Sequence, residues 1–264
     1  MYIFLCEDSI DGIFTGVYDA WASRYGHQNV ALTTHAPDNY SLFDKYISVP
    51  CDFDKSAKVA RTLHSRMGDE TYQEICQAAL ALEPNHKRKL INKADAIYKT
   101  IVLALSLPDA GKVLNYLGEP YVNRTFQLSR CTGNEAHHLL GFLRFQELEN
   151  GILFAQIHPK NDVLPFLGEH FSDRLPEENF MIHDATRDLA VLHPQGNGFF
   201  ITDTKEIDHR MLQRLSPQEM EYRRLWRTFF DNIAIEARKN PALQNQNLPK
   251  RFRKDIVEFN SIDI

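Results

Sequence analysis

The spacing of the apolar residues changes at about residue 142, and this change is the strongest constraint on the fold. Before it, apolar residues recur every three or four positions over residues 54–118, which indicates a block of helices, and a further helix is expected over 120–140. After it, short apolar runs are separated by turn residues, a pattern typical of strands. A chain that holds the two patterns in separate stretches is expected to be an α+β protein.

The first 34 residues differ from the helical block that follows them. Residues 2–6 and 29–34 are short apolar runs, and between them Ile13, Val17 and Trp21 fall on one face of a helical pattern. This order predicts a β-α-β unit that opens a small parallel sheet. The helices of the block are expected to start at Asp54, Asp69, about residue 88 and Asp109, with ends near Gly68, Pro84, Leu107 and Gly118.

The strand-like stretch is expected to form a central antiparallel sheet with one inserted helix. The pair Asn150-Gly151 between runs at 142–148 and 152–157 predicts a hairpin with a type I′ turn, because that turn needs positive φ angles. The inserted helix and three further strands are expected at residues 162–171, 180–184, 189–193 and 199–203.

The last part of the chain is expected to be a basic helical arm. Ser216, Pro217 and Glu219 are the residues favoured at the cap, first and third positions of a helix. At helical spacing, one face of this helix is apolar, and it holds Tyr222, Leu225, Trp226, Phe229, Phe230, Ile233 and Ala237. We expect two regions, 1–118 and 119–264, in one globule or two.

Three features of the sequence exclude other protein classes. The sequence contains no apolar run of about 18 residues, so no membrane span is expected. The start lacks a basic segment of the kind that begins a secretory signal. Cys6, Cys51, Cys76 and Cys131 are far apart, which disfavours a zinc ribbon, an iron–sulfur cluster or a redox pair and suits a reducing cytoplasm.

Charge is distributed unevenly along the chain. Residues 210–254 hold eleven Lys and Arg against four acidic residues, a balance of +7, so the rest carries −12 of the total of −5. Such polarity indicates a surface that faces an anion.

Several segments resemble a family of proteins assigned to DNA metabolism and DNA repair. They are DGIFTGVYDA (11–20), EAHH (135–138), GFLRF (141–145), IHP (157–159), IHD (182–184) followed by Arg187, residues 226–240 and LPKRF (248–252). The family contains a domain of unknown function and is usually encoded beside a radical-SAM protein of presumed DNA-repair role. Some of its members carry an additional uracil-DNA-glycosylase-like domain, which we do not expect within these 264 residues.

The basic arm is the first candidate site. Arg and Lys side chains neutralise DNA phosphates without reading the bases, and an aromatic ring among them can stack on an exposed base. The residues expected to contact nucleic acid are Arg223, Arg224, Arg227, Lys250, Arg251, Phe252, Arg253 and Lys254. The alternative is a solvated helix that pairs with the acidic part of the chain.

A second candidate site is catalytic. His183, Asp184 and Arg187 lie at an expected turn between strands, and Arg144 is expected on a neighbouring strand. Asp184 would act as a general base while the arginines hold a phosphate. The alternative is a structural turn in which Asp184 binds its own backbone and pairs with Arg187. The histidines between residues 137 and 193 show no paired metal-binding spacing, and neither a metal nor a cofactor is expected.

Charge and resemblance together predict a DNA-binding protein in DNA repair or modification, accessory to a radical-SAM partner. The first alternative is a hydrolase or glycosylase-like enzyme that acts on nucleic acid through His183, Asp184 and the arginines. The second alternative is a scaffold without nucleic-acid contact.

Overall fold

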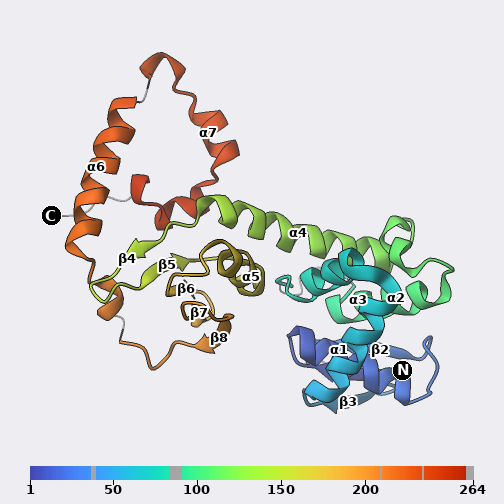
Figure 1. The fold of residues 1–264 in the computed structure, drawn as a ribbon. Coiled ribbons are helices and arrows are strands. Elements are labelled where there is room, and N and C mark those ends of the chain that lie inside the picture. Colours follow the sequence, from blue (N-terminus) through green and yellow to red (C-terminus); the bar gives the residue numbers. More distant parts are fainter. Residues whose placement is uncertain (37–39, 84–90, 209, 234, 260–264) are drawn as a thin grey trace. The chain divides into compact units, whose positions relative to one another are not determined.

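The computed structural model describes residues 1–36, 40–83, 91–208, 210–233 and 235–259, and it confirms the α+β class (Figure 1). Its contacts divide the chain into two compact units, Met1–Asn134 and Glu135–Ile264. The boundary lies within one helix, α4 (Pro120–Phe142), and not at residue 118. The reason is that Val122 and Leu128 of α4 belong to the core of the first unit, while Leu139 belongs to that of the second.

The first unit begins with the expected β-α-β arrangement. Its elements before α4 are β1 (Tyr2–Cys6), α1 (Ile10–Ala22), β2 (Val30–Thr33), β3 (Lys45–Val49), α2 (Phe53–Ala79), α3 (Lys93–Ser106) and the 3-10 helix η1 (Ala110–Asn115). The three strands are parallel in the order β2-β1-β3. Ser9 caps α1 by accepting a 2.9 Å hydrogen bond from the Gly12 amide.

The helical block differs from the expectation in four details. Asp52, rather than Asp54, caps α2, and the helices expected on either side of Gly68 are joined there by a kink with φ 77° and ψ 171°. Asn92 caps α3. The helix start expected at about residue 88 lies outside the described residues. The segment after Asp109 is a 3-10 helix without a side-chain cap.

The second unit is built on a sheet of five strands in the order β4-β5-β6-β7-β8. Its elements after α4 are β4 (Gln146–Glu147), β5 (Leu153–Ile157), α5 (Leu164–Arg174), β6 (Phe180–Asp184), β7 (Leu189–His193), β8 (Phe200–Asp203), η2 (Met211–Gln213), α6 (Pro217–Ile233), η3 (Glu236–Arg238), α7 (Pro241–Asn247), η4 (Lys250–Asp255) and η5 (Val257–Phe259).

The sheet is mixed, so the expectation of a wholly antiparallel sheet is wrong. β5 and β6 pair in parallel, while the other three pairs are antiparallel. In the sequence, helix α5 connects β5 to β6, and it returns the chain to the end of the sheet at which β5 began. The inserted helix is therefore a crossover connection.

The hairpin of β4 and β5 is confirmed, but its turn type is not. Gly151 has a φ of 79°, whereas Asn150 is not among the residues with positive φ, and a type I′ turn needs both. The Gly151 amide donates to the Leu148 carbonyl at 2.9 Å, and the Leu148 amide to the Ile152 carbonyl at 3.0 Å. This pattern is that of a longer loop with glycine at the left-handed position.

The two faces of the larger sheet are covered differently. On one face, Ala155, Ile157, Ile182 and Val191 pack in a cluster with residues of α4, α5 and η4. On the other, Phe154, Met181 and Ala190 pack beneath Ile207, Leu212 and Leu215. The second face carries the candidate site.

Candidate nucleic-acid interface

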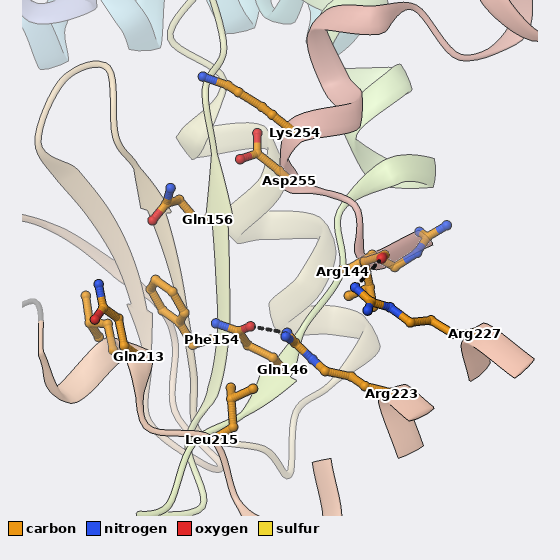
Figure 2. A pocket seen from close by; sticks show the side chains of 12 residues that line it. Arg144, Gln146, Phe154, Gln156, Gln213, Leu215, Arg223, Arg227, Lys254 and Asp255 are labelled. Carbon is orange, nitrogen blue, oxygen red and sulfur yellow. Dashed lines mark hydrogen bonds between the residues drawn. The ribbon is translucent and has the colours of Figure 1, made fainter. Parts of the chain in front are cut away.

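A pocket of about 350 Å³ opens beside the edge strand β4 of the second unit (Figure 2). Four of its lining side chains are cations, and one is a carboxylate. The lining residues are Arg144, Gln146, Phe154, Gln156, Leu212, Gln213, Leu215, Arg223, Arg227, Lys254, Asp255 and Val257. We call this the basic pocket.

Local structure explains how these side chains reach one place. Phe154 and Gln156 are two residues apart on β5 and therefore face the same side of the sheet. Arg223 and Arg227 are four residues apart on α6 and therefore lie on the same side of that helix. Lys254 comes from η4.

Four contacts fix the orientation of Arg223 and Arg144 in the pocket. Arg223 donates from Nε to Oε1 of Glu219 at 2.8 Å and also bonds the side chain of Gln146, as Figure 2 shows. Arg144 lies 3.4 Å from the Glu258 carboxylate and donates to the Gly141 carbonyl at 2.9 Å. These bonds hold the two guanidinium groups against the wall of the pocket.

The other two cations are placed by the C-terminal segment. Arg227 donates to the Val257 carbonyl at 3.3 Å, and Lys254 precedes Asp255 in η4. Burial raises the pKa of the Asp255 carboxyl, and the hydrogen bond from the His158 ring, 2.9 Å from Oδ1, acts in the opposite direction. Asp255 is thus fastened to the loop after β5.

The predicted nucleic-acid residues are not all together. Arg223, Arg227 and Lys254 line the basic pocket. Arg224 and Lys250 are exposed and do not line it. Arg251 pairs with the buried Glu135 at 3.2 Å, and Arg253 donates to the Asn245 side chain at 2.8 Å.

Phe252 is not placed to stack on a base, so that expectation is wrong. Its side chain is 4% exposed and lies among the rings of His138 and Phe142, with centroids 5.7 and 5.4 Å away. The short turn of η4 directs this ring into the core while its charged neighbours remain at the surface.

The predicted catalytic residues are not all brought together either. His183 and Asp184 are consecutive on β6 and therefore point to opposite faces of the sheet. His183 lies 3.2 Å from the Thr204 hydroxyl, whereas Arg144 lies in the basic pocket. Arg144 follows the end of α4 and does not belong to a strand.

Asp184 has the contacts of the structural turn that was the alternative. It is fully buried and accepts hydrogen bonds at 2.8 Å from both the Thr186 amide and the Arg187 guanidinium. Arg187 also donates to the Lys160 carbonyl. The catalytic role of these residues stays a prediction.

Sequence reasoning missed the polar side chains that complete the basic pocket. Gln146 and Gln156 lie on β4 and β5, and the alternation of Phe154 with Gln156 indicates only that they share a face. No local signal connects them to α6. Tyr222 and Trp226 were expected on an apolar face, and they line a second pocket that shares Arg144 and Arg223 with the first.

Within the described ranges, no group of three or more His, Cys, Asp and Glu side chains is placed to hold a metal ion. The same ranges contain no helix long and apolar enough to cross a membrane.

Fold and site together define an α+β protein with a basic pocket at the edge of a mixed sheet. Residues 92–258, more than half of the chain, match the family profile DUF4130, described as a domain of unknown function. The chain belongs to this family. Among curated proteins, none matches the chain.

Proposed function

We propose that this protein binds DNA through the basic pocket and acts in DNA repair or modification as the accessory of a radical-SAM enzyme. The observation that carries the proposal is the convergence of Arg144, Arg223, Arg227 and Lys254. These residues come from the end of α4, from α6 and from η4. An otherwise acidic chain thus places four cations in one pocket.

The chemistry of the pocket suits a phosphodiester backbone. Guanidinium groups bind phosphate oxygens in pairs, and a lysine adds a mobile positive charge. The amides of Gln146, Gln156 and Gln213 offer both donors and acceptors for sugar and phosphate groups. A volume of about 350 Å³ is within the range of ligand sites and holds a part of a nucleotide.

The assignment to repair and to a radical-SAM partner is supported by the resemblance of the sequence. It is also consistent with the spacing of Cys6, Cys51, Cys76 and Cys131, because an iron–sulfur centre needs thiolates that approach one cluster. The partner would supply the radical chemistry. Co-purification of the two proteins at micromolar concentration, with and without DNA, tests this part, and separate elution in every condition would contradict it.

The binding test compares two sets of substitutions on the same surface. Arg227→Gln with Lys254→Gln removes two charges from the basic pocket, whereas Arg224→Gln and Lys250→Gln remove two exposed charges outside it. We measure the affinity for labelled oligonucleotides by fluorescence anisotropy from 50 to 300 mM salt. Thermal melting of each variant reports whether the fold is intact.

We expect the pocket variant to lose at least about tenfold in affinity. The slope of its log affinity against log salt concentration should become shallower by the equivalent of about two phosphate contacts. The control variant should lose much less. Equal affinities for the pocket variant and the native protein would contradict the proposal. Absence of any salt-dependent binding to the native protein would favour the scaffold alternative.

A further inference from the structure

An aromatic stripe on α6 faces solvent beside the basic pocket. Tyr222, Trp226 and Phe229 are 67%, 44% and 52% exposed. They follow one another at spacings of four and three residues, which places them on one face of the helix. The rings of Trp226 and Phe229 are stacked at 5.6 Å with an interplanar angle of 30°. Large aromatic side chains exposed as a group mark a binding surface.

The stripe adjoins the cations directly. A second pocket of about 350 Å³ is lined by Tyr222 and Trp226, by Arg144 and Arg223, and by the carboxylates of Glu258 and Glu219, which pair with those two arginines. The same two arginines line the basic pocket. They therefore stand between a compartment rich in cations and a wall of aromatic rings.

We propose that the two pockets form one site for single-stranded DNA, in which phosphates occupy the basic pocket and bases stack on Tyr222 and Trp226. This inference rests on the proposed function and specifies its substrate class. Every base offers a flat face to an aromatic ring, so the contact tolerates any sequence. In a duplex those faces are covered by neighbouring base pairs, and only the base edges can be reached from the grooves.

The positive charge beside the aromatic stripe favours a nucleic acid over a protein as the ligand. A protein that covered the stripe would have to place carboxylates beside its apolar side chains, as Glu219 and Glu258 of this chain do, to match the arginines as well. A single strand presents an anionic backbone and aromatic bases side by side. This is the same pairing of chemistries that Arg144 and Arg223 set beside Tyr222 and Trp226.

The test replaces the rings without removing their apolar bulk. Trp226→Leu and Tyr222→Leu abolish stacking, Trp226→Phe retains a ring, and Leu225→Ala is the control because Leu225 is exposed on the same helix but lines neither pocket. The probes are a labelled single strand, the duplex of the same sequence and an abasic strand of the same length. Thermal melting again reports on the fold.

We expect the native protein to bind the single strand at least about tenfold more tightly than the duplex or the abasic strand. Each leucine variant should lose about tenfold on the single strand and little on the duplex. Trp226→Phe should lose less than Trp226→Leu, and Leu225→Ala should match the native protein. In a Trp21→Phe background, Trp226 is the sole tryptophan, and the single strand should quench its fluorescence.

The outcomes separate the two proposals. Binding that depends on salt, Arg227 and Lys254, but is equal for single strand and duplex and insensitive to the leucine variants, overturns the inference and leaves the proposed function standing. In that case the stripe serves another partner, such as a protein. Absence of all DNA binding overturns both.

Discussion

The guanidinium of Arg251 lies 3.2 Å from the carboxylate of Glu135, measured from Nη1 to Oε1. Glu135 is 1% exposed, and it also accepts hydrogen bonds from the Asn161 amide at 2.8 Å and from the Asn161 side chain at 2.7 Å. One buried carboxylate thus joins α4, the loop after β5 and η4. The contact holds η4 in place, and η4 positions Lys254 in the basic pocket.

The Glu135 contact predicts that Arg251 acts on stability before it acts on DNA. Arg251→Glu places a second carboxylate against Glu135 and should lower the free energy of unfolding by about 3 kcal/mol, because a buried charge loses its partner and meets a like charge. Lys250→Glu, at the exposed neighbouring position, should change it by less than about 0.5 kcal/mol. Urea denaturation measures both. Equal effects would show that the ion pair contributes nothing.

This prediction also governs how the basic arm is tested. A combined replacement of Arg251, Arg253 and Lys254 by Glu would weaken DNA binding even if only the fold had suffered, since Arg251 and Arg253 both hold the C-terminal segment in place. Substitutions at Arg227 and Lys254 are the sharper experiment.

Gly16 lies where α1 packs tightly against Cys6 of β1. A Cβ at this position would overlap Sγ of Cys6 and lie 3.2 Å from Cδ2 of Leu32. Gly16→Ala should therefore lower the free energy of unfolding by about 1–3 kcal/mol, although alanine favours the helix itself.

A double-mutant cycle provides the control for Gly16. Cys6→Ala removes the sulfur atom, so Gly16→Ala in that background should cost much less than in the native protein. Chemical denaturation of the four proteins measures the coupling. Additive effects would mean that the cost of Gly16→Ala does not come from the contact with the Cys6 sulfur.

Because two thiols are buried, we expect the free energy of unfolding to fall at alkaline pH. Burial raises the pKa of Cys6 to about 12 and that of Cys76 to about 11, whereas both ionise near their ordinary values in the unfolded chain. Between pH 9 and about 11 the unfolded state therefore binds fewer protons than the native state, and the free energy of unfolding falls as the pH rises.

The matched variant for this pH effect is the pair Cys6→Ala and Cys76→Ala. Its free energy of unfolding should fall less steeply between pH 8 and 10.5 than that of the native protein. Burial lowers the pKa of Lys99, which acts with the opposite sign in the same window, so the comparison is between the two slopes and not between absolute values. Parallel slopes would contradict a thiol contribution.

Folding is expected to need neither metal nor disulfide. In the described part of the chain, Cys6, Cys51, Cys76 and Cys131 form no disulfide, and no group of three metal-ligating side chains is found. Chelator and reductant should leave the melting temperature unchanged. A large drop with chelator alone would reveal a structural metal site.

Much of the fold follows from local patterns. The β-α-β start, the break at Gly68, the hairpin at Gly151 and the cap at Ser216, whose Oγ accepts from the Glu219 amide at 3.0 Å, were all predictable. Each depends on a periodicity or on a backbone preference that operates over a few residues. The same patterns placed Arg223 and Arg227 on one side of a helix.

What the sequence determined by itself is therefore the type of most elements, though not the strand β3, and the sign of the charge on the last of them. Only the tertiary structure decided that Arg144 joins Arg223 and not His183, that Phe252 turns inward against Phe142, and that Trp226 remains exposed. Strand alternation separates His183 from Asp184, and the crossover through α5 sets which strand ends meet. These relations depend on packing between segments far apart in the chain, and a local pattern carries no information about which distant segment will lie beside it.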